Sequence, residues 1–194
     1  VIGGLTLACG ARTSALYAIA VKGQCLLTTA ATAELVKLAE NAYRDVNIAF
    51  ANELSIISDR LGIDPWEAVR LANHHPRVNI LQPGPGVGGH CIAVDPWFIV
   101  DSAPDDTDLI RVARKVNDAK PGHLAEQIIH AANDMDAPVI ACLGLAYKAD
   151  IDDLRQSPAM DVVRLLAKAK AGQILCVEPH IETLPAELEG ATLS

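Results

Sequence analysis

The chain has 194 residues, of which 51% are hydrophobic and 4% aromatic, enough for a packed core in one large domain or two small ones. The formal net charge of −8 argues against nucleic acid as the main partner. No stretch reaches the ~20 apolar residues of a membrane span, so we expect no membrane partner. Five cysteines without CxxC spacing favour a reduced, cytoplasmic setting over a disulfide framework, and no zinc site or other metal site is expected.

The most extended periodic pattern predicts an unusually long helix over residues 29–61. Thr29 or Thr32 is expected to cap its start, and Gly62 is expected to end it. Such a helix spans about 50 Å, which is too long for one small domain to cover. We therefore expect it to pack against its own copy in a homodimer. Apolar residues at helical spacing predict its buried face: Leu35, Leu38, Ala42, Val46, Ala49 and Ile56.

Shorter helices are predicted on both sides of that helix. One covers residues 11–22, and a second opens at Asp64-Pro65 and runs to about Asn73. Residues 77–96 are predicted to be a loop. Two more helices are expected over 105–118 and 121–135, separated by a break at Lys120-Pro121-Gly122.

The last third of the chain changes to a βαβ pattern. Strands are predicted over residues 138–143 and 173–177, with a helix between them over 157–170. A two-stranded parallel sheet buries too little to be stable by itself, and a third strand would be due at 191–194. Because the chain also lacks an initiator Met, we expect it to be an internal piece of a longer protein. Domain boundaries are predicted at 1–118 and 119–194.

The most informative motif is Gly-Pro-Gly-Val-Gly-Gly-His-Cys at residues 84–91, followed by Asp95-Pro96. Glycines without a Cβ let the backbone pass close to a bulky ligand, and Pro83 and Pro85 stiffen the loop. The motif predicts a cradle that presents the Cys91 thiol, a nucleophile suited to capturing a carbonyl carbon. A Gly/Pro turn before a buried structural cysteine is the alternative. The glycines of the cradle are Gly84, Gly86, Gly88 and Gly89.

Polar residues inside the apolar pattern of the long helix are candidates for the same site. Lys37 and Asn41 are four residues apart, so they share one face at the edge of a core. A solvated stripe is the plainer interpretation, and Arg44 is assigned to another face of the helix. Further along, Arg77 could grip an anion.

The βαβ half offers a second group of candidates after its first strand. Ligands of open α/β sheets bind beyond the carboxyl ends of the strands. Tyr147 could stack on a base there, and Lys148 could pair with a phosphate. Glu178 ends the second strand, where a carboxylate can hold a ribose diol, although a plain turn is the favoured interpretation.

Three motifs occur together and in order, and their combination resembles a known family. They are the loop at 84–96, Ala-Glu-Leu-Val-Lys-Leu-Ala-Glu-Asn at 33–41, and Tyr-Lys-Ala-Asp-Ile-Asp-Asp-Leu-Arg-Gln-Ser-Pro-Ala at 147–159. They are similar to the nucleotide-sugar 6-dehydrogenases of the UDP-glucose/GDP-mannose dehydrogenase family. The resemblance implies an α-helical central dimerisation domain, like the C-terminal domain of 6-phosphogluconate dehydrogenase. An incomplete α/β Rossmann-like UDP-binding domain would follow, and the NAD-binding N-terminal domain would be absent.

The resemblance also implies a reaction and its catalytic residues. A sugar C6 alcohol would be oxidised in two NAD-dependent steps to a uronic acid, through a thioester on Cys91. Lys37 and Asn41 would stabilise negative oxygen, and Asp95 would position or deprotonate water.

Binding roles follow from the same resemblance. The glycines of the cradle would contact the substrate, and Arg77 would reach sugar or carboxylate across the dimer. Tyr147 and Lys148 would bind UDP, and Arg155 would contact NAD. One departure, Val94 in place of the lysine usual in UDP-glucose dehydrogenases, favours an N-acetylated sugar over glucose.

Other functions remain open from the sequence. The chain could be a non-catalytic module for nucleotide-sugar binding and dimerisation, or part of a UDP-glucose 6-dehydrogenase. An unrelated thiol hydrolase using Cys91 and His90 is disfavoured, because adjacent residues rarely place base and nucleophile properly. The chain alone is expected to be inactive as a dehydrogenase.

Overall fold

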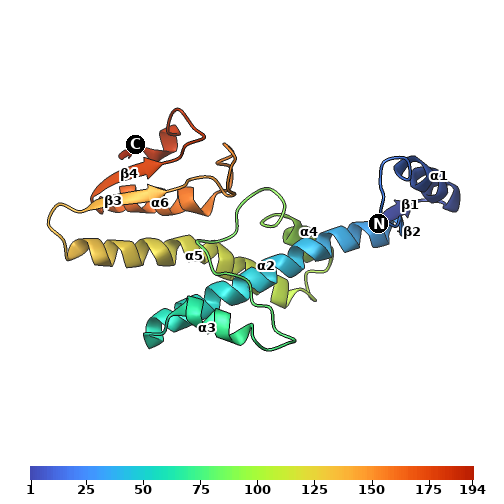
Figure 1. Cartoon of the computed structure of the whole chain (residues 1–194), viewed down its shortest axis with the longest axis horizontal. Helices are drawn as coiled ribbons and strands as arrows, with labels where there is room; N and C mark the ends of the chain where they lie inside the picture. Colours follow the sequence, from blue (N-terminus) through green and yellow to red (C-terminus); the bar gives the residue numbers. More distant parts are fainter.

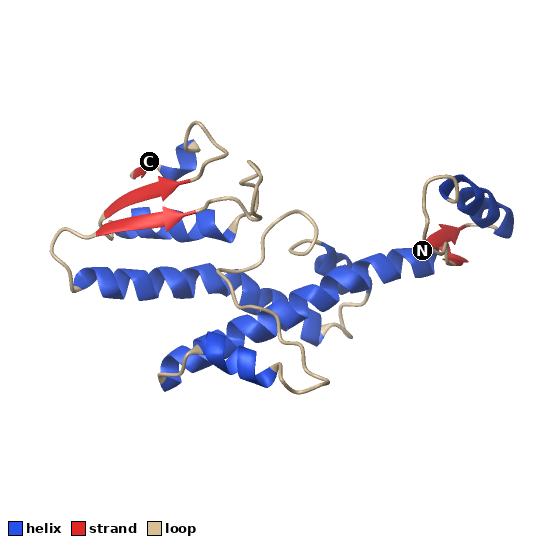
Figure 2. Ribbon diagram, viewed as in Figure 1, coloured by secondary structure: helices blue, strands red, loops and turns tan.

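The structure is a computed structural model that describes residues 1–194. The molecule is elongated around two crossing helices, α2 (Ala30–Leu61) and α5 (Asp108–Asn133). A small N-terminal α/β unit lies at the start of α2, and α3 (Pro65–Ala72) folds back beside its end (Figures 1 and 2). The second half of α5 leads into the C-terminal α/β part. The predicted order of a helical part followed by an α/β part is confirmed.

The N-terminal unit was not predicted. Strands β1 (Ile2–Gly4) and β2 (Leu27–Thr29) pair in parallel and are joined by α1 (Leu7–Tyr17). The helix expected over 11–22 therefore begins four residues earlier, where the Thr6 side chain accepts a hydrogen bond from the Cys9 N–H at 3.2 Å. Three-residue strands are too short to leave a periodic signal in the sequence.

The predicted ends of α2 and α3 are confirmed by their caps. Thr29 accepts a hydrogen bond from the Thr32 N–H at 3.2 Å, and Gly62 adopts the left-handed conformation with φ of 66°. Asp64 caps α3 through the Trp66 N–H at 2.9 Å. The loop expected over 77–96 is followed by a helix that the sequence analysis missed, α4 (Asp95–Ser102).

The break predicted at Lys120-Pro121-Gly122 is wrong, because α5 is continuous with Pro121 inside it. An interior proline costs about 3 kcal/mol in an isolated helix. Here α5 packs against α2 along one half and against α6 along the other, and this packing outweighs that cost. Because α5 also runs through positions 118 and 119, the helical and α/β parts share one helix.

The C-terminal part is a three-stranded parallel sheet with α6 (Pro158–Ala169) against it. Strand β4 (Gln173–Val177) lies between β3 (Val139–Leu143) and β5 (Ala191–Leu193). The two predicted strands and the helix are confirmed, but the sheet is not two-stranded as expected, because residues 191–193 form a third strand. A short 3₁₀ helix, Ala186–Leu188, connects β4 to β5.

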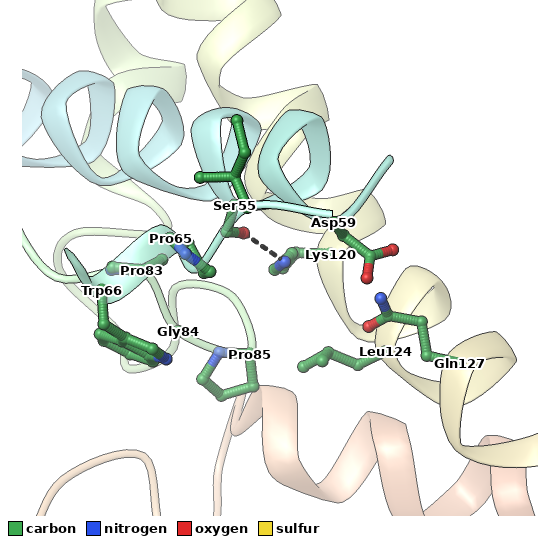
Figure 3. Close-up of a pocket in the computed structure, with 11 residues that line it drawn as sticks. Ser55, Asp59, Pro65, Trp66, Pro83, Gly84, Pro85, Lys120, Leu124 and Gln127 are labelled. Atoms are coloured by element: carbon green, nitrogen blue, oxygen red, sulfur yellow. Dashed lines mark hydrogen bonds between the residues drawn. The ribbon is translucent and has the colours of Figure 1, made fainter. Parts of the chain in front are cut away.

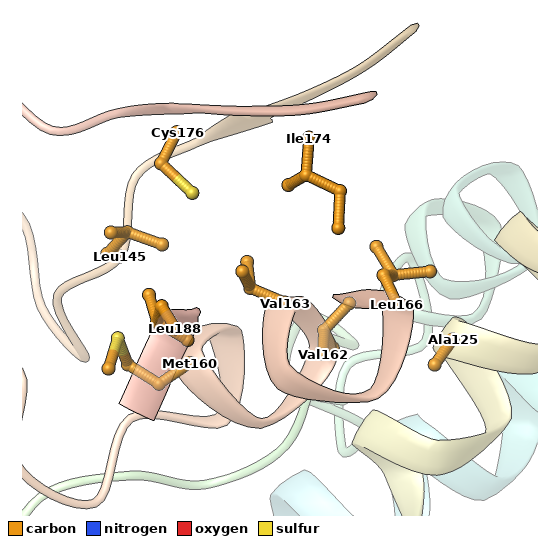
Figure 4. Packing of buried hydrophobic residues seen from close by; sticks show 9 residues of the cluster. All are labelled: Ala125, Leu145, Met160, Val162, Val163, Leu166, Ile174, Cys176 and Leu188. Carbon is orange, nitrogen blue, oxygen red and sulfur yellow. The ribbon is translucent and has the colours of Figure 1, made fainter. Parts of the chain in front are cut away.

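The hydrophobic core sits in this part, with α6 between the sheet and α5 (Figure 4). From α6, Val163 and Leu166 are fully buried, and they pack with Ile174 of β4 and Ala125 of α5. The opposite face of the sheet has no helix on it, so Val139 and Leu143 are exposed. None of the chain's helices combines the length and apolar character needed to cross a bilayer.

The buried face of α2 differs from the predicted one. Ala42 and Ala49 are buried as expected, but Leu35 is 58% exposed. Polar residues take up much of the contact with α5, and Asp45 is fully buried there. It accepts hydrogen bonds from Arg114 at 2.6 Å and from Asn117 at 2.8 Å. Burial raises the pKa of Asp45, and the Arg114 guanidinium opposes that rise.

Candidate functional site

A cavity of about 570 Å³ opens where three segments meet: the first half of α2, the glycine-rich loop, and the loop that follows β3. Its size falls within the range of small-molecule sites. The lining includes most of the residues that the sequence motifs singled out: Lys37, Asn41, Gly86, Gly88, Gly89, Cys91, Tyr147 and Lys148.

Helix α2 supplies one wall through a single stripe of side chains. Lys37, Asn41 and Arg44 follow the i, i+4, i+7 spacing that keeps residues on one face. The assignment of Arg44 to another face was therefore wrong, and the same spacing could have identified it. Asn41 donates from Nδ2 to Oδ2 of Asp95 at 2.5 Å, so the amide ties α2 to the start of α4.

The glycine-rich loop delivers the thiol at its end. Cys91 is exposed, and its carbonyl accepts hydrogen bonds from the N–H groups of Val94 at 3.0 Å and Asp95 at 2.8 Å. This turn leads directly into α4. Asp95 falls in the first turn of α4, where the helix dipole stabilises a carboxylate. One thiol and one carboxylate are thereby held on a short, well-defined turn.

Two glycines of the loop approach protein rather than open space. A Cβ on Gly88 would lie 2.6 Å from the Gln156 carbonyl oxygen, and one on Gly89 would lie 2.8 Å from the Tyr147 ring. The Gly89 N–H also donates to the Gln156 carbonyl at 3.3 Å. These glycines therefore let the cysteine loop dock onto the loop after β3, and this brings Tyr147 beside Cys91 in the same cavity.

Glu178 orders the loop that carries Tyr147 and Lys148. Its carboxylate accepts the N–H of Leu145 at 2.8 Å and that of Ala146 at 3.1 Å. These backbone hydrogen bonds lower the pKa of Glu178, that from Leu145 most of all. The Oε2 oxygen is thus engaged by its own protein and Oε1 accepts the His180 N–H at 3.4 Å, which agrees with the turn interpretation.

Four of the predicted site residues do not line the cavity, namely Asp95, Gly84, Arg77 and Arg155, although Asp95 is hydrogen-bonded to Asn41, which does. The Gly84 N–H donates to Oδ1 of Asn52 in α2 at 2.8 Å. Arg77 is exposed on the segment after α3. Arg155 is exposed and forms a bidentate pair with Asp153, and its hydrogen bonds lower the pKa of that carboxyl to about 2.

The charge of the cavity is opposite to that of the whole chain. Three basic side chains line it, Lys37, Arg44 and Lys148, and no carboxylate does. Asp95 is near but is engaged by Asn41. In a protein with a net charge of −8, this local positive potential selects an anionic ligand. His90 also lines the cavity, but no hydrogen bond joins it to Cys91 or to a carboxylate, so a Cys–His hydrolase is not supported.

The residues of this chain do not fit a dinucleotide by themselves. The N-terminal unit has parallel strands, but the turn after β1 reads Leu-Thr and carries no Gly-x-Gly-x-x-Gly sequence. Arg155, the one residue expected to contact NAD, is held by Asp153.

Comparison with family models matches two parts of the chain. Residues 31–119 match the central domain of the UDP-glucose/GDP-mannose dehydrogenase family. Residues 141–194 match the UDP-binding domain of the same family.

Similar proteins agree with these matches. An NDP-N-acetyl-D-galactosaminuronic acid dehydrogenase of Ralstonia solanacearum is 59% identical over 193 residues, which are 100% of this chain and 46% of that protein. A UDP-N-acetyl-D-mannosamine dehydrogenase of Campylobacter jejuni is 58% identical over 97% of this chain and 46% of its own length. The chain thus spans about half the length of the curated relatives it matches.

Solved structures give the same result for the fold. The UDP-N-acetyl-mannosamine dehydrogenase of Staphylococcus aureus superposes with a TM-score of 0.82 at 44% identity, over 93% of this chain and 43% of that one. The corresponding enzyme of Pyrococcus horikoshii gives a TM-score of 0.84 at 38% identity, over 98% and 49%.

Proposed function

The chain belongs to the UDP-glucose/GDP-mannose dehydrogenase family, and on that premise we propose that it is part of a nucleotide-sugar 6-dehydrogenase. The reaction is the two-step oxidation of a UDP-sugar C6 alcohol to the uronic acid. One observation carries the proposal. The thiol of Cys91 shares a cavity with three cations, and that cavity joins the central part of the chain to its UDP-binding part.

In this proposal each pocket residue has one task. Lys148, with Tyr147 beside it, binds the UDP moiety, and Arg44 adds a second cation for the anionic part of the substrate. The sugar then extends toward Cys91, with its C6 between the thiol and the stripe of Lys37 and Asn41.

The chemistry at C6 follows from the thiol. Oxidation of the alcohol gives an aldehyde, and the Cys91 thiolate adds to its carbonyl carbon to form a thiohemiacetal. Lys37 and Asn41 stabilise the negative oxygen that develops. Loss of a second hydride gives a thioester. Water positioned by Asp95 cleaves it, releasing the carboxylate and restoring the thiol.

NAD is the proposed cofactor, and when bound it would supply a hydride acceptor for the two oxidations. The relatives that match are about twice as long as this chain, and we assign the main dinucleotide contacts to residues beyond it. Arg155 is proposed as this chain's contact with NAD. That role requires the exposed Arg155 to exchange its hydrogen bonds with Asp153 for bonds to the cofactor.

The substrate is proposed to be UDP-N-acetyl-D-mannosamine. Two observations favour an N-acetylated sugar over UDP-glucose: Val94 stands where UDP-glucose dehydrogenases usually carry lysine, and the similar proteins are named for N-acetylated sugars. Five free cysteines favour a reducing compartment, so we place the enzyme in the cytoplasm.

A homodimer through α2 completes the proposal. Tyr43, Phe50 and Ile57 are exposed on α2 at intervals of seven residues, which is the spacing of a seam between two helices. Arg77 does not line the Cys91 cavity of its own subunit. We propose that it reaches the substrate bound to the other subunit. The boundary between central and UDP-binding domains is proposed at 118/119.

The direct test is the stoichiometry of the reaction. The complete protein, supplied with UDP-N-acetylmannosamine and NAD, should form two NADH for each uronate. It should prefer this substrate to UDP-glucose in kcat/KM. The 194-residue chain alone should form none, because it lacks a dinucleotide loop. One NADH per product, with a keto-sugar released, would contradict the proposal.

A further inference from the structure

A second cavity, of about 510 Å³, lies on the other side of the cysteine loop. The two cavities divide that loop between them, since Pro83–Pro85 line this one and Gly86–Ile92 line the one that holds Cys91. Its remaining walls come from the last turns of α2, the start of α3 and the middle of α5. Figure 3 shows Ser55 and Lys120 joined across the top of this space.

The distinctive group in this cavity is a buried ammonium. Lys120 is only 5% exposed, and its Nζ donates to Oγ of Ser55 at 2.7 Å. An ammonium has three donors, and the one partner here is a neutral hydroxyl. Burial lowers the pKa of Lys120, an effect that the carboxylate of Asp59 opposes without forming an ion pair with it. A buried cation without an anionic partner is costly, so an anion at this point would be bound favourably.

The surroundings of Lys120 also suit an organic body. Trp66 is half exposed and lies at one side of the space, with Pro85 beside it (Figure 3). Leu124 extends the apolar floor, and the Gln127 amide offers a further donor on the far side. An aromatic wall opposite a few convergent polar groups is the usual composition of a small-molecule site.

We propose that this cavity is a second ligand site, which binds a small organic anion with a carboxylate or phosphate head and a flat apolar body. The head group lies on Lys120 with Ser55 and Gln127, and the body stacks on Trp66. The carboxylate of Asp59 opposes binding and limits affinity. Because the Cys91 cavity shares none of these side chains, the site is independent of the dehydrogenase chemistry.

Tryptophan fluorescence provides the test. The chain has two tryptophans, Trp66 and Trp97, so Trp97→Phe leaves Trp66 as the only reporter. Titration of this variant with phenyl phosphate and with benzoate should quench the fluorescence of Trp66 in a saturable way in the millimolar range. The probe that binds more tightly identifies the preferred head group. The absence of saturation with both probes would overturn the proposal.

Substitutions at the head-group position make the test specific. Lys120→Met should weaken binding about tenfold or more, whereas Lys120→Arg should retain most of it. Asp59→Asn should tighten binding several-fold, a gain that a damaged fold would not give. Lys148→Met, in the other cavity, should leave the dissociation constant unchanged. Unchanged binding by a folded Lys120→Met variant, or weaker binding by Asp59→Asn, would refute the site.

Discussion

The carboxylate of Glu178 shows how one residue can support the site without contacting a ligand. It closes the loop after β3 by accepting two backbone N–H groups, and that loop carries Tyr147 and Lys148 into the Cys91 cavity. A charged acceptor makes stronger hydrogen bonds than a neutral one. Loop geometry, and with it UDP binding, should therefore depend on the ionised form of Glu178.

This gives a pH-dependent prediction. The pKa of Glu178 lies below its usual value of 4.5, so its contribution to stability is complete above that value and is lost as pH falls through the lowered pKa. Glu178→Gln should lower the free energy of unfolding by about 1 to 2 kcal/mol at pH 7. The loss should be much smaller at a pH below the lowered pKa of Glu178, where the parent side chain is protonated as well. Urea unfolding at both pH values is the measurement. An equal loss at both would show that the charge is irrelevant.

Some site residues could be predicted from the sequence and others could not. Cys91, Asn41 and Asp95 were expected to act together, and the structure brings them together because a glycine-rich loop leads to a short turn beside α2. Arg44 was missed because polar residues on a helix were read as solvated. The docking of Gly88 and Gly89 onto Tyr147 depends on contacts between distant segments, which no local pattern encodes.

At the scale of elements, an amide relay connects the two long helices to the cysteine loop. Asn52 of α2 donates to Oδ1 of Asn117 at 2.9 Å and accepts the Gly84 N–H at 2.8 Å. Asn117 in turn donates to Asp45. Asn52 and Asn117 are almost fully buried, so water cannot reach their amide groups. These hydrogen bonds satisfy the amide groups in its place.

Breaking the relay should therefore be costly. Asn52→Ala leaves the Gly84 N–H and the Asn117 oxygen without partners, and should lower the free energy of unfolding by about 2 to 4 kcal/mol. Asn47→Ala is the matched control, because Asn47 bonds only to the Tyr43 carbonyl of its own helix. Denaturant unfolding of the two variants gives the comparison. If Asn52→Ala lowered the free energy of unfolding less than Asn47→Ala does, the relay would not stabilise the fold as proposed.

The elements themselves were predictable where local chemistry decides them. The ends of α2 and α3 follow from Thr29, Gly62 and Asp64, which cap helices through their own side chains or backbone freedom. The break predicted at Pro121 does not occur, because the proline penalty is local, whereas the packing that overrides it comes from α2 and α6. The three-residue strands β1 and β2 left no periodic pattern in the sequence. Their pairing joins segments that are far apart along the chain, so no local pattern encodes it either.

At the scale of the whole molecule, α2 has two faces of unexpected character. Its buried face is rich in polar groups that α5 satisfies, while Tyr43, Phe50 and Ile57 are exposed. At 1.5 Å per residue, its 32 residues extend about 48 Å, well beyond what α5 covers. The exposed stripe from Tyr43 to Ile57 covers about 21 Å of that length, and an exposed apolar stripe is typical of an interface.

We expect this stripe to hold two copies together. Phe50 is 51% exposed near the centre of α2, and Phe50→Glu would place two charges near a two-fold axis. The parent chain should sediment as a dimer at high micromolar concentration, and the variant as a monomer. Leu16→Glu on α1, which is also exposed, should remain dimeric. A monomeric parent chain would exclude the interface.

Cys91 is the residue proposed to carry the covalent step. The most direct test of that role is the mass of the complete protein, quenched in acid during turnover of UDP-N-acetylmannosamine with NAD. The parent should carry the acyl group of the sugar on the peptide that contains Cys91, and Cys142→Ser should behave in the same way, because Cys142 lies in the sheet against the core. Cys91→Ser should carry no adduct and form no uronate. Uronate produced by Cys91→Ser at the parental rate would contradict the account.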